Sequence, residues 1–370
     1  MDILIDENIP FLAEALNENP ENLFRVKRFQ GRTLASEALE ECIALCIRST
    51  TRINAALLQN TPVRFIGTAT SGSEHVDTDF LQEQGIFFRD ARGCNANSVA
   101  EYVVFAMLLW AEQRDLMQKK QALRGKTLGI IGYGHIGRRV AALATKLGMR
   151  VLVNDPPFAA SGGRFGGEVE EMHVEKILEE ADILTNHVPL IHTGTYQTSG
   201  LLGKRDFVRM RPLTLVIHAS RGGVVAEDAL WERLAADDIS AAIDVWQNEP
   251  LVNKTLAEGC LLATPHIAGY SFEGKVNGSV MIARELERFV KNVLGTQLHV
   301  NWNIFENALE RDYPVITTFE DHHLLLQTLR TSRMLEADTS AFLHSLEETE
   351  PAVAFDRLRK TYPQRREILA

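Results

Sequence analysis

The chain has 370 residues, which is enough for two or more domains. Its formal net charge is −10 at pH 7, whereas nucleic acids and acidic membranes bind to basic protein surfaces. The acidic N-terminus MDILIDENIP lacks the positive charge of a secretion signal, and the longest strongly apolar run, residues 103–111, is too short to span a bilayer. We therefore expect a cytoplasmic protein whose partners include neither nucleic acid nor a membrane.

The four cysteines, Cys42, Cys46, Cys94 and Cys260, show no C-x-x-C spacing and have no neighbouring pair of histidines. Buried free thiols in a reducing compartment are the simplest interpretation of this pattern. The sequence thus predicts neither a disulfide framework nor a metal site.

The first ninety residues alternate short apolar runs with helical patterns, which is typical of a small parallel α/β unit. The expected strands cover residues 2–5, 44–47, 63–66 and 86–88, and the expected helices cover 10–16, 53–58 and 80–84. Two of these strands run into polar segments, IRSTT at 47–51 and GTATSG at 67–72. Open α/β sheets bind ligands at the carboxyl ends of their strands, but Ser, Thr and Gly are equally common in ordinary loops, so both interpretations stay open.

The stretch TLGIIGYGHIGRRVAALATKLGMRVLVND at 127–155 has the pattern of a dinucleotide-binding unit. A buried strand leads into Gly132, Gly134 and Gly137, and a helix and a second strand follow. The first glycine permits a tight turn, the second lets backbone N–H groups approach a pyrophosphate, and the third lets helix and strand pack closely. Asp155 then lies where an acid binds the ribose hydroxyls and repels a 2′-phosphate. This pattern predicts NAD rather than NADP as the cofactor.

After Asp155 the alternation of strands and helices continues, which is enough for a complete doubly wound sheet. The expected strands cover 182–186, 213–217, 241–245 and 260–263, and the expected helices cover 174–180, 206–210 and 227–234. Two long helical patterns, one from Asn97 and one over 281–294, lead into and out of this unit, so we expect it to be inserted in the N-terminal one. Glu101 in the first of them is expected to be a paired or edge carboxylate rather than a catalytic one.

The pattern weakens beyond Gly295. Short apolar runs at 315–318 and 324–329 alternate with helical patterns at 341–346 and 355–360. A third small domain is the simplest account of these residues.

Three charged residues follow three successive predicted strands: Arg221 in ASRGG, Glu249 in DVWQNEP and His266 in TPHIAGY. The carboxyl ends of parallel strands meet in one crevice, so these side chains can come together. An arginine holds a carboxylate with paired hydrogen bonds, a histidine exchanges the proton of a hydroxyl, and a glutamate orients that histidine and favours its charged form. Each residue alone is weak evidence, but together they are the groups needed to oxidise a 2-hydroxy acid or reduce a 2-keto acid.

The set GYGHIG, Asp155, HVPL, ASRGG, DVWQNEP and TPHIAGY resembles the D-isomer-specific 2-hydroxyacid dehydrogenase family. One subgroup is matched more narrowly by IDENIP, IRSTTRIN, FIGTATSGSEHVD, ARGCNANSVAEYVV, PHIAGYSFEGK and FDRLRKTYPQRRE, and this resemblance spans nearly the whole chain. It implies an α/β fold in which a doubly wound Rossmann-type NAD domain (96–272) is inserted in a flavodoxin-like substrate domain (1–95 and 273–295). It also implies a small α+β dimerisation domain over residues 296–370, which ordinary members of the family lack.

The resemblance implies roles for individual residues. Arg221, Glu249 and His266 match the catalytic trio, with His266 as the proton acceptor in oxidation. The implied cofactor-binding positions are Gly132, Gly134, His135, Ile136, Gly137, Asp155, Val188, Ala219, Ser220, Arg221, Asp244 and Gly269. The implied substrate-binding positions are Ser49, Thr70 and Tyr270, which favours a ligand at the two polar N-terminal loops. Val188 is a departure, since valine lacks the hydroxyl of the threonine that can stand there in relatives.

The implied activity is the NAD-dependent oxidation, at C2, of a four-carbon 2-hydroxy acid that carries a phosphate on C4, in vitamin B6 biosynthesis, by a homodimer. One alternative is another 2-hydroxyacid dehydrogenase, acting on 3-phosphoglycerate or on an unphosphorylated acid. The other is an NAD-sensing, corepressor-like binding protein.

Four arginines are clustered near the C-terminus: Arg357, Arg359, Arg365 and Arg366. One hypothesis is that they help to hold the substrate phosphate, because a guanidinium binds phosphate with paired hydrogen bonds. The alternative is a solvated basic helix face.

Overall fold

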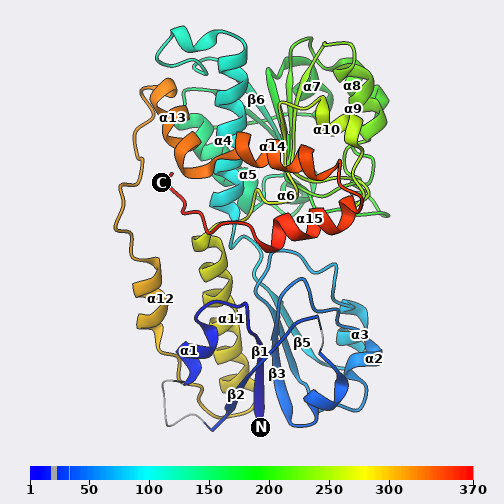
Figure 1. Cartoon of the computed structure of the whole chain (residues 1–370), viewed down its shortest axis with the longest axis vertical. Helices are drawn as coiled ribbons and strands as arrows, with labels where there is room; N and C mark the ends of the chain where they lie inside the picture. Colours follow the sequence, from blue (N-terminus) through cyan, green and yellow to red (C-terminus); the bar gives the residue numbers. More distant parts are fainter. Residues whose placement is uncertain (18–22, 33, 370) are drawn as a thin grey trace. The chain divides into compact units, whose positions relative to one another are not determined.

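The computed structural model describes residues 1–17, 23–32 and 34–369. They form two compact units, residues 1–95 with 271–314 and residues 96–270 with 315–370 (Figure 1). Residues 96–270 are therefore inserted in the first unit, and the chain from residue 315 onwards belongs to the second. Within the described ranges, every helix is too short or too polar to cross a membrane.

The first unit contains a five-stranded parallel sheet in the order β2-β1-β3-β4-β5, which is the flavodoxin-like order. Its strands are β1 (Asp2–Asp6), β2 (Arg25–Phe29), β3 (Cys42–Ile47), β4 (Phe65–Thr68) and β5 (Phe87–Asp90). Strand β2 was not predicted, because this edge strand, RVKRF, is largely exposed and carries charged side chains in place of an apolar pattern.

Alternate residues of these strands face two helical layers. Ile3 and Ile5 pack towards α1 (Leu12–Asn17) and α11 (Phe272–Val293), with α12 (Trp302–Leu309) beside them. Leu4 faces the other layer, which consists of α2, α3 and a 3-10 helix. The bounds in that layer are α2 (Ala55–Leu58), α3 (Thr78–Glu83) and η1 (Ser36–Leu39). Figure 1 shows α11 running alongside the sheet of this unit.

Helix α11 begins at Phe272, well before the predicted start at residue 281. Ser271 caps it, and the Ser271 Oγ accepts a hydrogen bond from the Gly274 N–H at 2.9 Å. A Cβ on Gly278 would lie 2.4 Å from the carbonyl oxygen of Ala69, so glycine allows α11 to approach the loop after β4. The glycines that permit this approach also weaken the helical sequence pattern, which explains the late predicted start.

The second unit contains seven parallel strands in the order β12-β11-β10-β9-β6-β7-β8. Their bounds are β6 (Thr127–Ile131), β7 (Arg150–Asn154), β8 (Glu170–Glu171), β9 (Ile183–Asn186), β10 (Leu215–His218), β11 (Ser240–Ile243) and β12 (Leu262–Ala263). The strand order reverses between β6 and β9, where Leu128 pairs with Ile183. Such a switch point is where doubly wound sheets bind dinucleotides, and the predicted fold class is confirmed for this unit.

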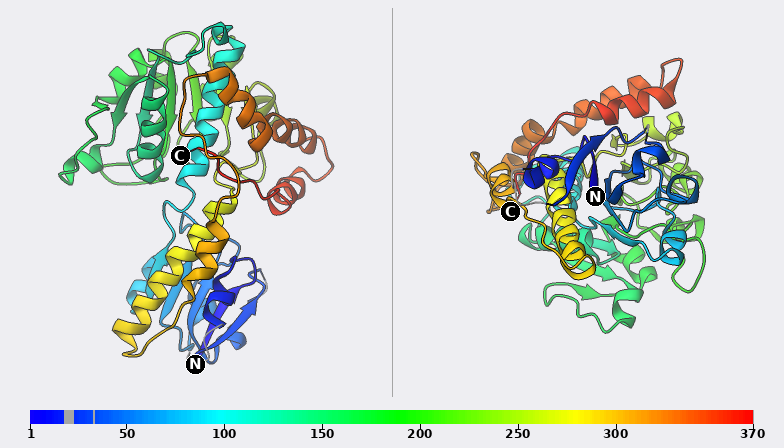
Figure 2. Two further views of the ribbon diagram at one scale, coloured as in Figure 1. Left: turned by 90° about the vertical axis from the view of Figure 1, so that its left-hand side faces the viewer. Right: turned by 90° about the horizontal axis from the view of Figure 1, so that it is seen from below.

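Helices cover both faces of this sheet. They are α4 (Ala96–Gln113), α5 (His135–Lys146), α6 (Pro156–Ala160), α7 (Val174–Glu180), α8 (Lys204–Arg209), α9 (Glu227–Leu234) and α10 (Lys254–Glu258), and a 3-10 helix, η2 (Leu116–Gln118), follows α4. Helix α4 is almost entirely buried, because it contacts α5 and also α13 (His322–Arg333) of the C-terminal segment (Figure 2).

The α+β character predicted for residues 296–370 is wrong for the described residues, which form α12, α13, α14 (Leu335–Ser345) and α15 (Pro351–Lys360). The short apolar run 324–329 lies in α13, whose N-terminus is capped by Asp321. A short apolar run cannot distinguish a strand from a buried helix face. Of the run 315–318, Ile316 forms an isolated bridge with Leu369.

Candidate active site

The glycine turn after β6 has the geometry of a phosphate-binding turn. Gly132 has a φ of +94°, and a Cβ there would lie 2.8 Å from the carbonyl oxygen of His187, just after β9. A Cβ on Gly137 would lie 2.0 Å from the carbonyl oxygen of Gly132, so glycine is needed for α5 to pack on the turn. A Cβ on Gly134 would meet nothing within 4 Å. The backbone at Gly134 is therefore open to a ligand.

The N-terminus of α5 supplies donors for an anion. Gly134 is the N-cap and has no side chain to accept from the first turn, which leaves the N–H groups of His135 and Ile136 for a ligand. Asp155, at the end of β7, accepts from the N–H of Tyr133 at 2.7 Å and from the N–H of Phe158 at 3.0 Å. Donors for a pyrophosphate and a fixed carboxylate for a ribose thus lie at one sheet edge. These residues fit NAD.

His266 and Glu249 form a hydrogen-bonded pair on the loops after β12 and β11. The Glu249 Oε2 lies 2.8 Å from the His266 Nδ1, and the Glu249 Oε1 accepts from the N–H of Trp246 at 3.0 Å. The imidazole is 31% exposed. Because Glu249 holds Nδ1, Nε2 is the ring nitrogen that can exchange a proton with a ligand.

The Glu249 carboxyl is tuned by opposing effects. Burial raises its pKa. Three groups lower it: His266 through its hydrogen bond and charge, Trp246 through its N–H, and Arg359 through its charge. The lowering outweighs the effect of burial, so the pKa of Glu249 lies below its ordinary value. Glu249 is therefore an anion at neutral pH, as a partner for an imidazolium must be.

Asp244, at 1% exposure, holds the loop that carries His266. Its carboxylate accepts from the Thr264 hydroxyl at 2.6 Å, from the N–H of Ile267 at 2.7 Å and from the N–H of Ala268 at 2.9 Å. Asp244 is one of the positions that the family resemblance implies for cofactor binding. In the structure its carboxylate organises the histidine loop.

Arg221 follows β10, and its Nη1 donates to the Ser220 carbonyl at 2.8 Å. A Cβ on the next residue, Gly222, would lie 1.9 Å from the carbonyl oxygen of Trp246. Glycine thus allows the Arg221 loop to touch the loop that leads to Glu249. The three predicted catalytic residues lie after adjacent strands of one sheet, on loops that contact or hydrogen-bond to one another.

The other predicted cofactor positions also follow strands of this sheet: Val188 follows β9, Ala219 and Ser220 follow β10, and Gly269 lies beyond β12. Sequence reasoning missed a buried polar cluster next to them. The Asn186 Oδ1 lies 3.2 Å from the His218 Nδ1 and accepts from the Ser220 hydroxyl. Burial lowers the pKa of His218 to about 3, so its ring is neutral. The sequence does hold a signal for this cluster: Asn186 and His218 are the last residues of their strands, and polar residues at the carboxyl ends of such strands lie at the ligand-binding edge of the sheet.

The predicted substrate positions lie in both units. Ser49 and Thr70 belong to the first unit, where they follow the neighbouring strands β3 and β4. The Thr70 Oγ1 lies 2.9 Å from the Thr68 Oγ1. Tyr270 belongs to the second unit and packs edge-on against Tyr362, with ring centroids 5.8 Å apart.

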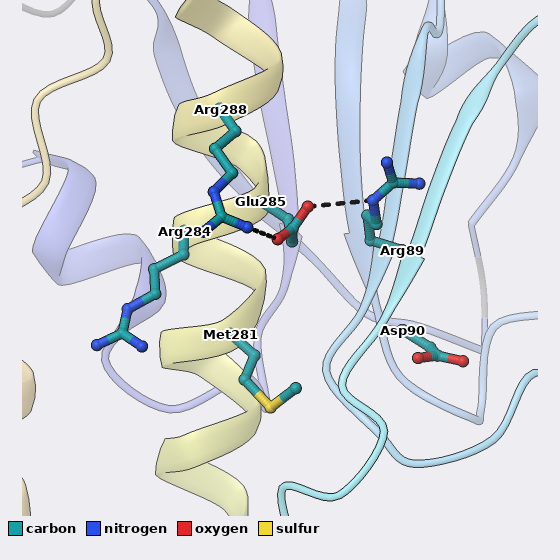
Figure 3. A pocket seen from close by; sticks show the side chains of 6 residues that line it. All are labelled: Arg89, Asp90, Met281, Arg284, Glu285 and Arg288. Atoms are coloured by element: carbon teal, nitrogen blue, oxygen red, sulfur yellow. Dashed lines mark hydrogen bonds and ion pairs between the residues drawn. The ribbon is translucent and has the colours of Figure 1, made fainter. Parts of the chain in front are cut away.

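A hollow of about 310 Å³ lies between β5 and α11 in the first unit (Figure 3). It is lined by Arg89, Asp90, Met281, Arg284, Glu285 and Arg288. Glu285 forms ion pairs with both Arg89 and Arg288. These six lining residues include none of the predicted catalytic, cofactor-binding or substrate-binding positions, so the hollow is not part of the predicted site.

Comparisons with known proteins agree with this geometry. Residues 103–268 match the family model of the D-isomer specific 2-hydroxyacid dehydrogenase, NAD binding domain. The chain is 39% identical to an erythronate-4-phosphate dehydrogenase from Azotobacter vinelandii, over 100% of the chain and 93% of that protein. It is 38% identical to one from Salmonella arizonae, over 99% of the chain and 92% of that protein.

Solved structures show the same fold at lower identity. A D-lactate dehydrogenase from Aquifex aeolicus, in complex with NAD and lactic acid, has a TM-score of 0.60 at 22% identity and covers 80% of this chain and 97% of its own. A protein from Thermus thermophilus has a TM-score of 0.65 at 24% identity and covers 81% of this chain and 99% of its own.

A doubly wound nucleotide fold with an imidazole–carboxylate couple at its strand ends is that of an NAD-dependent dehydrogenase. The relatives that match the full length of the chain then identify the subgroup of dehydrogenases. The chain belongs to the D-isomer specific 2-hydroxyacid dehydrogenase family, among the erythronate-4-phosphate dehydrogenases. The predicted family, the enzyme class and NAD as cofactor are thereby confirmed.

Proposed function

We propose that this enzyme oxidises 4-phospho-D-erythronate at C2 to (R)-3-hydroxy-2-oxo-4-phosphobutanoate, a step of pyridoxal phosphate biosynthesis. The proposal is carried by the Glu249–His266 couple, in a chain that matches erythronate-4-phosphate dehydrogenases over its full length. NAD, when bound, supplies the acceptor for the hydride that leaves C2.

The side chains divide the remaining work. His266 takes the proton of the C2 hydroxyl on Nε2, while Glu249 keeps the ring oriented through Nδ1 and stabilises its positive charge. Arg221 binds the carboxylate on C1 with paired hydrogen bonds and polarises the developing carbonyl. General base catalysis of this kind contributes about 10²–10⁴-fold to the rate.

Ser49, Thr70 and Tyr270 are our candidates for further substrate contacts. Their hydroxyl groups suit an oxygen-rich acid, and Ser49 and Thr70 follow neighbouring strands of the flavodoxin-like sheet. Arg48 and Lys275 lie near each other in the same unit, because the pKa of Lys275 is lowered by burial and then by the charge of Arg48.

We further infer a cytoplasmic homodimer that associates through residues 296–370. Leu324, Met334 and Val353 of this segment are 64%, 51% and 56% exposed, which supports a surface covered by a second copy. Free thiols at Cys42 and Cys46 suit a reducing compartment. Light scattering on the purified protein should give twice the chain mass of 41.4 kDa, and a monomeric mass would contradict the dimer.

Steady-state assays test the activity. We expect NAD-dependent turnover of 4-phospho-D-erythronate with a kcat/KM far above that for 3-phosphoglycerate or D-lactate, and loss of turnover in His266→Ala. A higher kcat/KM for another acid would reassign the substrate. Tight NADH binding without turnover of any acid would indicate a sensor rather than an enzyme.

A further inference from the structure

We propose that Arg359, on the C-terminal helix α15, binds the phosphate group of the substrate. The inference depends on the proposed function, because it concerns the group that distinguishes 4-phospho-D-erythronate from simpler 2-hydroxy acids. It selects one residue from the C-terminal arginine cluster and gives the C-terminal segment a direct part in substrate recognition.

Arg359 differs from its neighbours because it has no carboxylate partner among the described residues. Four other arginines of this segment form ion pairs with carboxylates. Arg330 pairs with Glu112 and Glu336, Arg333 with Glu101, Arg357 with Glu348, and Arg365 with Asp338. In the described part of the chain, Arg359 forms no ion pair, and its buried Nε donates no hydrogen bond. A buried guanidinium N–H without an acceptor is destabilising, so an anionic ligand is favoured there.

Arg359 lies next to the catalytic loop within the second unit. Its guanidinium carbon is 5.9 Å from the ring centroid of Tyr270, four residues after His266, and 5.7 Å from that of Phe355. Its charge also acts on Glu249. Burial raises the pKa of the Glu249 carboxyl, whereas His266, the N–H of Trp246 and the charge of Arg359 all lower it. The Arg359 cation is therefore within electrostatic reach of the couple that acts on C2.

Helix α15 is held firmly over this loop. Tyr362 packs against Tyr270 and donates to the Asp338 Oδ2 at 2.9 Å. Arg365 binds both oxygens of Asp338, at 2.6 and 2.7 Å, which makes it a structural residue. These contacts fix the backbone that carries Arg359, so its guanidinium is preorganised for a ligand.

The substrate carries two anionic groups on one short carbon chain. Arg221 is our candidate for the carboxylate beside C2, and the dianionic phosphate on C4 needs a separate cation. A planar guanidinium binds phosphate through two parallel hydrogen bonds, which adds orientation to charge neutralisation.

Arg359→Met, Arg359→Lys and the matched control Arg357→Met test the inference. In Arg359→Met we expect the KM for 4-phospho-D-erythronate to rise about ten- to a hundredfold, and the inhibition constant of inorganic phosphate to rise in parallel. We expect kcat/KM for unphosphorylated D-erythronate to stay unchanged. Arg359→Lys should lie between wild type and Arg359→Met, and Arg357→Met should match wild type.

Two outcomes would overturn the inference in a folded Arg359→Met variant, as judged by its near-UV circular dichroism. One is an unchanged KM for the phosphorylated acid together with unchanged inhibition by phosphate. The other is an equal loss on both acids, which would make Arg359 a positioning residue for Glu249. A wild-type enzyme that does not turn over 4-phospho-D-erythronate would instead refute the proposed function.

Discussion

His266 occupies a strained backbone conformation that its surroundings maintain. Its φ of +57° is uncommon for a residue with a side chain, and such residues persist where several contacts hold them. The His266 N–H donates to the Asp244 carbonyl at 2.8 Å, and the Asp244 carboxylate binds the next two N–H groups of the loop. Asp244 thus holds the loop that carries His266, and the imidazole is hydrogen-bonded to Glu249.

Glu249→Gln keeps the shape of this couple but removes its charge. We expect kcat for oxidation to fall about a hundred- to a thousandfold, because the carboxylate orients the imidazole and stabilises the charge that it gains in proton transfer. An unchanged kcat would show that Glu249 has no part in proton transfer.

The same pair should affect stability with a defined sign. Because the folded-state pKa of Glu249 lies below its ordinary value of 4.5, its contribution is present above that pH and is lost as the pH falls through the folded value. Urea unfolding of wild type and Glu249→Gln should therefore differ at pH 7 and converge at acid pH.

Gly222 determines how closely the loops of Arg221 and Trp246 can approach each other. We expect Gly222→Ala to reduce kcat/KM at least tenfold and to destabilise the fold by about 1–3 kcal/mol, because its Cβ would lie 1.9 Å from the Trp246 carbonyl oxygen. Gly167→Ala is a matched control, since a Cβ there would meet nothing within 4 Å. Equal kinetics in both variants would contradict this account.

At the scale of elements, α4 connects the C-terminal segment to the histidine loop. The Glu101 Oε1 accepts from the N–H groups of Ile368 and Leu369, both at 2.6 Å, which confirms that Glu101 is a paired carboxylate. Arg333 of α13 lies 3.5 Å from the Glu101 Oε2 and donates to the Ala268 carbonyl at 3.3 Å. Helices α4 and α13 thus hold the chain terminus and the residue two positions after His266.

Arg333→Met tests how much the charge of Arg333 contributes to stability through its ion pair with Glu101. It leaves Glu101 as an unpaired buried acid, which we expect to cost about 3–5 kcal/mol of unfolding free energy. Burial raises the pKa of Glu101 to about 7, so the protonated form stabilises the fold at acid pH and this contribution is lost as the pH rises through that value. The loss of unfolding free energy in Arg333→Met should therefore be larger at pH 8 than at pH 5.

The double variant Arg333→Met with Glu101→Gln is the control, and it should recover part of the lost unfolding free energy. A loss that is independent of pH would show that the charge of Glu101 is not its cause.

At the scale of the whole molecule, the glycine turn that is predicted to bind the cofactor belongs to the inserted unit. A ligand that binds the folded state and not the unfolded chain stabilises it by about 2.7 kcal/mol at a hundred times its dissociation constant. NAD should therefore raise the melting temperature, and NADP should raise it much less, because Asp155 is predicted to repel a 2′-phosphate.

Asp155→Asn tests the source of this preference. The substitution removes the repulsive charge. Because the N–H groups of Tyr133 and Phe158 donate to different oxygens of Asp155, and an asparagine has one acceptor oxygen, the variant keeps one of these two hydrogen bonds. We expect calorimetry to show a smaller difference between NAD and NADP in this variant. A preference as large as that of wild type would show that Asp155 does not discriminate.

The sequence by itself was sufficient for the features that depend on neighbours in the chain. The turn of Gly132, Gly134 and Gly137, the acid at Asp155 and most strands could be predicted, because backbone freedom and hydrophobic periodicity are local properties. The edge strand β2 and the start of α11 could not, since exposure in one case and glycines in the other removed the local signal.

Tertiary structure alone decided which distant groups meet. The hydrogen bond between Glu249 and His266, the use of Asp244 to hold the histidine loop, and the ion pair that Arg365 forms with Asp338 join residues that the sequence leaves apart. The helical form of the C-terminal segment was decided in the same way. An apolar run takes the conformation that buries it against its surroundings, and those surroundings come from other parts of the chain.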